Sequence, residues 1–375
     1  MSGPHRKKLF LVLASRRAFE AFTGPVPASL EQNFRFLKPR NAARIRALLP
    51  ACRLVISKSY PRPRVNGWIF EARRLGIPTL LLVDGPLEWA NVHHNPSLSR
   101  PGAEAARALF EPVVHDAVAC IGDAQSTWIA HKNEGRGVTR MSYASQRIGS
   151  SHDAATPNSQ SEADRRFDFL VSTAKTPAFD EREKANLATV LAACGEALEA
   201  AGYRTLVRLF DPDLRRTMAA AAPSATFEQD GSFEEALALT RCVIGTPSSV
   251  LLEAMQHRRP TGTLMFRDSP LFYQTGWLLG CNTDWRSSFE SMLAHDPARI
   301  DLQRKTLRDN LSEEDFFAHC ERIAEGTLLP RVRPLDGADL EFENRVLRGL
   351  LGWRARWLAP LLRVRSRSRG ETKDD

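Results

Sequence analysis

The residues in this chain that could do chemistry stand at the ends of short apolar runs. The clearest case is Asp84, which directly follows the run Thr79–Val83 and precedes Gly85 and Pro86. A carboxylate at the carboxyl end of a buried parallel strand projects into the crevice where such sheets bind ligands, and partial burial raises its pKa toward that of a useful base. Asp84 is therefore the first catalytic candidate; the alternative is an ordinary Asp-Gly turn.

Polar and aromatic side chains crowd the segment after Asp84. Glu88 lies four residues further on, and Trp89, Asn91 and His93 come next. Such a mixture suits sugar binding, because a ring stacks on the sugar while amides and carboxylates bind its hydroxyl groups. We expect Glu88 to be a second catalytic candidate and the other three residues to bind an acceptor.

A second set of candidates lies in residues 242–264, which read as strand, tight turn, helix and strand. Residues 245–247 make the turn, and Ser248 and Ser249 stand where the helix begins. Free N–H groups at a helix N-terminus form an anion site together with hydroxyl groups, and Glu253, about one turn further on, can accept hydrogen bonds from ribose hydroxyls. The alternative to this donor site is a plain capped helix.

Two more strand ends in the second half of the chain carry groups that suit a phosphate. The first apolar run of that half is followed by Ser172, Thr173 and Lys175, which are hydrogen-bond donors at the edge where a ligand crevice forms. Arg208 stands within the apolar run Thr205–Leu209 and needs an anion. We assign all four to donor binding. A Pro-containing turn would explain the first three equally well, and a structural ion pair would explain Arg208.

These strand ends belong to an alternation of short apolar runs and helical stretches. Continuous Leu/Val/Ile runs of this kind predict a parallel sheet covered on both faces. The predicted strands are Leu9–Ala14, Leu54–Ser57, Thr79–Val83 and Ala117–Ile121, and then Phe167–Val171, Thr205–Leu209, Cys242–Gly245 and Thr261–Met265. The predicted helices are Ala28–Leu49, Gly67–Leu75 and Gly102–His115, and then Glu181–Ala201, Asp213–Ala222, Phe233–Thr240 and Ser248–His257.

A polar segment without apolar periodicity, residues 149–166, divides the chain into two α/β units. Its Ser, Asn, Pro and charge content is typical of a linker. We predict one α/β domain over residues 1–148, a second over 167–335, and a C-terminal helix with a basic tail over 336–375. The predicted fold class is α/β, with two doubly wound, Rossmann-like domains that face each other across a cleft.

The composition is that of a globular protein. Of the 375 residues, 43% are hydrophobic and 26% are charged, which excludes a disordered chain, a collagen and a small disulfide scaffold. No run reaches the roughly 18 apolar residues that a membrane span needs, and Leu9–Ala14 is too short for a signal peptide. The six cysteines form no CxxC pair and no zinc-finger spacing, so we expect a reducing cytoplasm and no structural metal.

The motif Ser-Ser-x-x-x-Glu-Ala-Met at residues 248–255, with a strand entered through Pro260 after it, resembles the donor domain of GT-B glycosyltransferases. Residues 268–277 resemble the segment after that motif in bacterial surface-polysaccharide transferases of the capsule type and in Kdo-transferase-like families. The glycine-rich donor loop of better-known members is missing. The resemblance implies transfer of a sugar from a nucleotide-sugar to a glycan or lipid-linked acceptor, in capsule or lipopolysaccharide assembly. It implies that residues 1–148 form the acceptor-side domain and residues 167–335 the nucleotide-sugar-binding domain. Asp84 and Gly85 resemble the acceptor-side site of Kdo-transferase-like proteins, which implies that Asp84 is the base or the nucleophile.

Two motifs suggest a metal, and we discount both. Asp211-Pro212-Asp213 has the DxD spacing that a different glycosyltransferase fold uses for a metal, but Asp-Pro after a strand is more simply a turn with a helix N-cap. The adjacent residues His93 and His94 rarely ligate one ion as a pair. We expect no metal and no cofactor, with the nucleotide-sugar as substrate, because fixed cations and a helix terminus can stabilise the leaving phosphate.

The basic charge gathers at the C-terminal end. Residues 345–375 hold eight arginines and one lysine against three acidic residues, so they carry +6 of the net charge of +8. Arg mixed with Leu and Trp at helical spacing, including Trp353 and Trp357, is typical of a helix in an anionic membrane interface. We therefore expect a cytoplasmic protein, peripheral at the inner face of the membrane. Packing of the first part of this helix on the body is the alternative, and RNA binding is a third and weaker one.

Two other functions remain open. A sugar-nucleotide epimerase would use the same fold and donor site, but it needs no lipid or glycan acceptor and gains nothing from a basic tail rich in Trp. A non-catalytic, membrane-associated assembly factor would keep the fold and bind a nucleotide without turnover.

Overall fold

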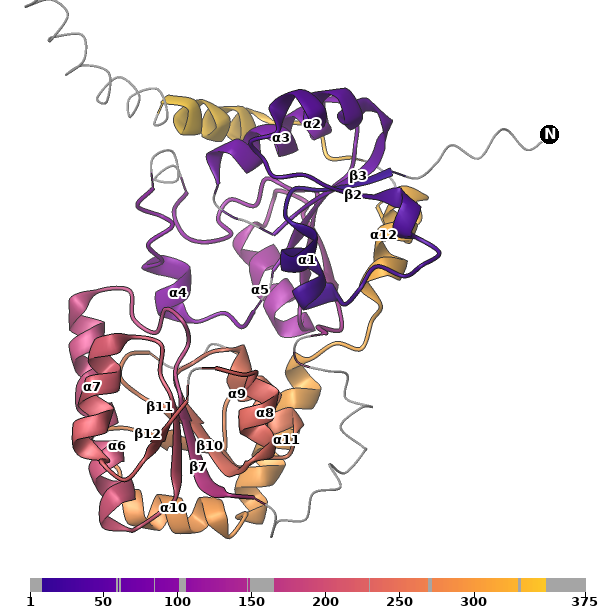
Figure 1. The fold of residues 1–375 in the computed structure, drawn as a ribbon. Helices are drawn as coiled ribbons and strands as arrows, with labels where there is room; N and C mark the ends of the chain where they lie inside the picture. Colours follow the sequence, from indigo (N-terminus) through magenta and orange to yellow (C-terminus); the bar gives the residue numbers. More distant parts are fainter. Residues whose placement is uncertain are drawn as a thin grey trace, which may run out of the picture.

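The chain folds into two α/β domains. The computed structural model describes residues 9–348 except 59, 61, 84, 101–105, 147, 149–164, 229, 269–271 and 330–331. These residues form two six-stranded sheets in which every strand pair is parallel. Helices flank both sheets, and one domain lies above the other (Figure 1). The predicted fold class of two doubly wound domains is confirmed.

The first sheet has the strand order β2-β1-β3-β4-β5-β6. Because β1 has β2 on one side and β3 on the other, the sheet reverses its direction of growth at β1. Its strands are β1 (Leu9–Val12), β2 (Phe34–Phe36), β3 (Cys52–Ser57), β4 (Thr79–Leu82), β5 (Ala117–Cys120) and β6 (Thr139–Ser142). The helices between them are α1 (Arg16–Thr23), α2 (Ala42–Leu48), α3 (Pro63–Arg74), α4 (Trp89–His93) and α5 (Asp123–Lys132).

Two predicted helices of this domain are wrong in whole or in part. The range Ala28–Leu49 contains the edge strand β2 as well as α2. Phe34 of β2 packs its ring 4.9 Å from that of Phe10, so tertiary packing outweighs the local helical pattern. In Gly102–His115, the described residues 106–115 form turns around an isolated bridge, not a helix.

The second sheet has the order β12-β11-β10-β7-β8-β9. All four strands and all four helices predicted here are confirmed to within a few residues. The strands are β7 (Phe167–Ser172), β8 (Thr205–Arg208), β9 (Thr226–Phe227), β10 (Thr240–Gly245), β11 (Thr261–Leu264) and β12 (Trp277–Leu279). The helices are α6 (Glu181–Ala200), α7 (Pro212–Ala221), α8 (Phe233–Ala238), α9 (Ser249–Gln256), α10 (Trp285–Leu293) and α11 (Pro297–Asn310).

The DxD sequence begins helix α7, as expected. The Asp211 side chain accepts hydrogen bonds from the backbone N–H groups of Asp213 and Leu214 at 2.9 and 3.1 Å. Both aspartates also pair with Lys184, at 3.0 and 2.6 Å. The motif is therefore an N-cap with an ion pair.

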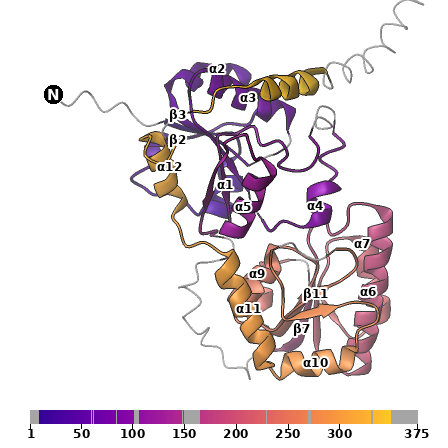
Figure 2. The same ribbon diagram turned by 180° about the vertical axis from the view of Figure 1, so that it is seen from behind.

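After α11 the chain returns to the first domain. Helix α12 (Phe316–Ala324) lies beside α1 in both views of the molecule (Figure 1 and Figure 2). The Phe316 ring lies 5.6 Å from Phe19 and 5.5 Å from Tyr143, both in the first domain. The predicted end of the second domain at residue 335 is therefore too late, because residues 316–335 come after the crossing between the domains.

Helical residues 337–348 also pack on the first domain. For the start of the C-terminal helix, this is the predicted alternative of packing on the body of the protein. Phe342 and Val346 are buried in its core. Asp339 is fully buried and pairs with Arg136 and, at 2.9 Å, with Arg73 of α3. Residues beyond 348, including Trp353 and Trp357, and linker residues 149–164 lie outside the described residues. None of the described helices is long and apolar enough to cross a membrane.

Asp339 provides a test of how strongly this segment is anchored. We expect Asp339→Ala to lower the free energy of unfolding by about 3–5 kcal/mol, because the fully buried Arg73 guanidinium loses a carboxylate. Asp301→Ala is the matched control; its carboxylate is 71% exposed and pairs with Arg304, so its loss costs less than about 1 kcal/mol. Denaturant titrations followed by tryptophan fluorescence measure both. Equal small losses would show that the Asp339 cluster does not anchor the segment.

Candidate functional site

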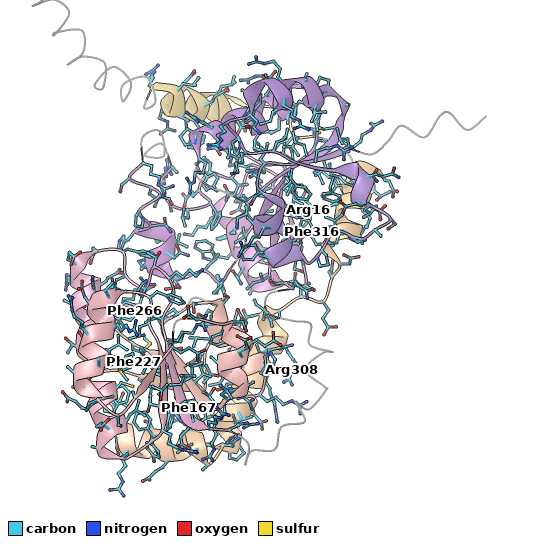
Figure 3. The ribbon with its side chains drawn as sticks, in the orientation of Figure 1. Arg16, Phe167, Phe227, Phe266, Arg308 and Phe316 are labelled. Atoms are coloured by element: carbon cyan, nitrogen blue, oxygen red, sulfur yellow. The ribbon has the colours of Figure 1, made fainter. Side chains whose placement is uncertain are left out.

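The carboxyl ends of the second sheet's strands point toward the first domain. Phe167 opens β7 and lies at the far end of the second domain, whereas Phe266, just after β11, lies at the end that faces the first domain (Figure 3). Loops after parallel strands are where such sheets bind ligands, at the point where the strand order reverses. In this sheet the reversal lies between β7 and β10.

The loops after β7 and β10 are joined into one surface. Thr246 donates its backbone N–H to the Ser172 carbonyl at 3.3 Å, and its side-chain oxygen accepts from the N–H of Ala174 at 2.8 Å. Gly245 permits this contact, because a Cβ at that position would lie 2.8 Å from the Ser172 carbonyl oxygen. The strand reversal point is therefore closely packed and fixed.

Four of the predicted donor residues come together at this surface. Ser172 and Thr173 are each 2% exposed, and the Thr173 hydroxyl has no hydrogen-bond partner. Ser248 precedes α9, but its side chain does not cap the helix; it donates to the Thr246 carbonyl at 3.3 Å. The first N–H groups of α9, beginning at Ser249, are therefore not satisfied by that side chain. Two joined loops that carry a buried hydroxyl without a partner and an uncapped helix start are suited to an anionic ligand.

Glu253 lies one turn into α9 and is half-buried. Its place on the helix that begins at Ser249 matches the predicted one. Its role toward a ribose remains a prediction.

Arg208 has a role that neither of the two interpretations included. It is 8% exposed at the end of β8, and its guanidinium donates to the carbonyls of Asp230, Gly231 and Ser232 at 3.5, 2.7 and 3.1 Å. It thus holds the turn before α8 through the backbone. Lys175 is exposed, and its ammonium group lies 5.9 Å from the ring of Phe210.

A buried ion cluster joins the two domains next to this surface. Arg267, which follows β11, donates to Glu88 of the first domain at 2.7 Å and to Glu183 of α6 at 2.9 Å. All three side chains are at most 12% exposed. The guanidinium also lies 4.6 Å from the ring of Phe179. One cation therefore serves two carboxylates at the domain boundary.

Burial at this cluster gives Glu88 the properties of an acid–base group. Burial raises the pKa of Glu88 to about 7, although the Arg267 guanidinium opposes the shift. A carboxyl group with a pKa near neutrality can both give and accept a proton at physiological pH. The catalytic assignment of Glu88 has a physical basis in this position.

The predicted acceptor residues share the short helix α4, directly after Glu88. Trp89 is 49% exposed and its ring lies 4.1 Å from that of His93. The Asn91 side-chain oxygen accepts a hydrogen bond from Asn95 at 2.6 Å. A second domain contact fixes the start of this helix, because Ala90 donates its N–H to Asp268 at 2.9 Å. Asp84 lies outside the described residues.

Arg267, Glu183 and Thr246 were not among the predicted site residues. Arg267 comes two residues after the predicted strand Thr261–Met265. Like Arg208, it is a cation at the end of an apolar strand, and this pattern is the sequence signal that identifies it. Among the described residues, no group of three or more His, Cys, Asp and Glu side chains could hold a metal ion.

A cavity of about 390 Å³ adjoins the turn before α9. It lies between α11 and the segment joining β11 to β12, and its lining includes Phe272, Tyr273 and Asn310. The Tyr273 hydroxyl donates to the Ser248 carbonyl at 3.4 Å. The Phe272 ring lies 6.1 Å from that of Trp128 in the first domain, so this cavity is also close to the domain boundary.

No family model and no curated protein matches this sequence. Among solved structures, the chain is similar to UDP-GlcNAc 2-epimerase from Neisseria meningitidis bound to UDP-GlcNAc. The identity is 11%, the TM-score is 0.53, and the match covers 86% of this chain and 100% of that one. It is also similar to S. aureus MnaA in complex with UDP, with 11% identity, a TM-score of 0.51, and 88% and 100% of the two chains covered.

At this identity the similarity establishes the fold alone. This chain is a two-domain α/β protein with the GT-B arrangement of facing parallel sheets. The Kdo-transferase-like character is a finer prediction that these matches do not bear on.

The raised pKa of Glu88 predicts a pH dependence of stability. The folded state holds this proton more tightly than the unfolded chain, so the stability linked to it is present below pH 4.5 and is lost as the pH rises through about 7. Between these limits we expect the free energy of unfolding of the wild type to fall by on the order of 3 kcal/mol relative to that of Glu88→Gln. Urea titrations of both proteins across this range, with Glu341→Gln as an exposed control, measure the difference. Parallel curves for wild type and Glu88→Gln would contradict it.

Proposed function

We propose that this protein is a glycosyltransferase that uses a nucleotide-sugar donor in the assembly of a bacterial surface polysaccharide. The observation that carries the proposal is the joined surface after β7 and β10. There the buried Thr173 hydroxyl after β7 has no partner, and no side chain caps the start of α9 after β10, at the strand reversal point of the second sheet. One of the two similar structures contains UDP and the other UDP-GlcNAc, and a nucleotide-sugar donor belongs to the same chemical class.

The donor would lie along this surface. The N–H groups at the start of α9 and the hydroxyls of Ser248 and Ser249 bind the phosphates and stabilise the charge that develops as they leave. Lys175 is exposed beside them and supplies a positive charge. Glu253 accepts hydrogen bonds from the ribose. Arg208 acts indirectly, by holding the turn at residues 230–232.

The first domain would supply the acid–base chemistry. Asp84 removes the proton from the acceptor hydroxyl, or attacks the anomeric carbon if the configuration is retained. Glu88, with a pKa of about 7, exchanges a proton with bound substrate, and Arg267 stabilises its ionised form. Trp89, Asn91 and His93 line the approach of a glycan or lipid-linked acceptor. The protein acts in the cytoplasm at the inner membrane surface, with residues 345–375 contributing to membrane attachment.

A sugar-nucleotide epimerase is the second candidate. The similarity to UDP-GlcNAc 2-epimerase and an acid–base carboxyl at the domain boundary both favour it. The two reactions differ in their need for an acceptor. Incubation with UDP-GlcNAc alone, with NMR of the sugar afterwards, would yield a 2-epimer only if the protein is the epimerase.

Nucleotide binding is the first measurement to make. We expect one of UDP, GDP, CMP, CDP and ADP to raise the melting temperature selectively, because a ligand of the folded state stabilises it. Thr173→Val should raise the dissociation constant of that nucleotide about tenfold. It should leave the stability of the free protein unchanged, because the Thr173 hydroxyl makes no hydrogen bond there. Thr189→Val, on the exposed face of α6, is the matched control. If none of these nucleotides raises the melting temperature, the result would contradict the glycosyltransferase proposal and favour the non-catalytic assembly factor.

Measuring sugar transfer and nucleotide affinity separately distinguishes the role of Asp84 from that of the donor site. Asp84→Asn should abolish sugar transfer to a glycolipid extract while leaving the affinity for the nucleotide unchanged, because it removes the base and keeps the side-chain shape. Transfer of labelled sugar from the donor identified above measures the first effect, and calorimetry the second. Wild-type rates in this variant would remove Asp84 from the mechanism.

A further inference from the structure

A second concentration of positive charge lies in the first domain, far in sequence from the basic tail. Residues 32–70 contain nine lysines and arginines and no aspartate or glutamate. Eight of these nine side chains are exposed, and Lys58 is half-buried. The exposed ones are Arg35, Lys38, Arg40, Arg44, Arg46, Arg53, Arg62 and Arg64.

Three of these arginines line a groove between α2 and α3. The groove has a volume of about 560 Å³, and its lining includes Arg40, Arg46, Arg64, Trp68 and Glu71. The Trp68 ring is half-buried and is fixed by a hydrogen bond from its indole N–H to the Pro39 carbonyl at 3.1 Å. The groove therefore combines three cations with an aromatic ring held in place.

The charges of this groove have no counterions within the described part of the chain. Among the described residues, no carboxylate forms an ion pair with Arg40, Arg46 or Arg64, and Glu71 at the groove pairs with Arg74 at 3.6 Å. The arginines at the other end of α3 differ in this respect, because Arg73 pairs with Asp339 and Arg74 with Glu343.

We propose that the α2–α3 groove binds the anionic headgroups of phospholipids and docks the protein on a membrane. The basic tail cannot fill the groove, because residues 345–369 hold eight arginines and no acidic residue and like charges repel. Helical residues 337–348 lie beside α2 and α3 (Figure 1 and Figure 2). The basic tail thus begins next to the groove, and an anionic surface that binds the groove lies within reach of the start of that tail.

The location of the groove leaves the candidate active site open. Helices α2 and α3 lie on the side of the first domain away from the second domain (Figure 1). Docking through them does not cover α4 or the loops after β7 and β10. Membrane docking through this groove does not depend on the sugar chemistry of the candidate active site. It is measured as membrane binding and not as turnover.

Vesicle binding tests the proposal on the full chain. We expect wild type to sediment with vesicles of phosphatidylcholine and phosphatidylglycerol but not with phosphatidylcholine alone, and to be released by salt. Replacing Arg40, Arg46 and Arg64 by Gln should weaken the binding roughly 100-fold, since each arginine contributes severalfold near an anionic surface. These side chains are exposed, so the variant should melt at the wild-type temperature.

A matched triple variant controls for total charge. Arg216→Gln, Arg286→Gln and Arg304→Gln remove the same charge from exposed positions of the second domain, and this protein should bind vesicles as wild type does. Three results would overturn the proposal. They are wild-type binding by the groove variant, equal losses in both triple variants, or a groove variant that loses affinity for single-stranded RNA while it keeps its affinity for anionic vesicles.

Discussion

The burial of Arg267 between two domains is the interaction on which the candidate site depends. A guanidinium removed from water must be paired, and here it takes one carboxylate from each domain, Glu88 and Glu183. One positive charge cannot fully compensate two buried negative ones. Removal of Glu88 from water is the largest cause of its raised pKa of about 7, and the Arg267 guanidinium opposes the shift without cancelling it. The burial that accompanies this domain contact thus creates an acid–base group at the boundary.

The chain path constrains the same boundary. Within residues 9–348 the chain passes from the first domain to the second before β7 and returns after α11, and the return is closely packed. Ser312 donates its N–H to the Ile121 carbonyl at 2.9 Å, and Glu314 accepts from Ala144 at 2.8 Å. A Cβ on Gly122 would lie 1.7 Å from the Asn310 carbonyl oxygen, so only glycine permits this approach. With α12 and helical residues 337–348 also on the first domain, the relative position of the two sheets is supported at several points.

In the second domain, the short and partly exposed edge strands β9 and β12 could not be predicted from sequence. The four inner strands β7, β8, β10 and β11 could be predicted, because each is largely buried and reads as a run of mostly apolar residues. The location of Ser172, Thr173, Ser248 and Ser249 could be predicted with them, since it depends only on which residues come after which strands. The edge strand β2 could not be predicted in this way. It has three residues, and its stability comes from contacts with Phe10 and Phe19, which the local sequence does not contain.

The residues that bind the buried arginines could not be predicted from sequence. Arg208 and Arg267 both lie at the ends of apolar strands of the second sheet, yet one binds backbone carbonyls of a turn and the other binds two carboxylates. Periodicity gives the location of such a side chain in the sheet. It does not give which loop of the chain will lie against it. The return of α12 to the first domain could not be predicted either, because the local sequence of α12 does not show which distant segment it packs against.

The arginines around α3 show how burial separates structural from functional charge. Arg73 is fully buried, and folding requires the carboxylates that surround it. Arg40, Arg46 and Arg64 are exposed, and water alone can solvate them, so the fold needs no partner for them. Nine like charges within residues 32–70 repel one another, which opposes folding. Since nothing in the packing of α2 or α3 requires this arrangement, an anionic surface outside the protein is its best physical explanation.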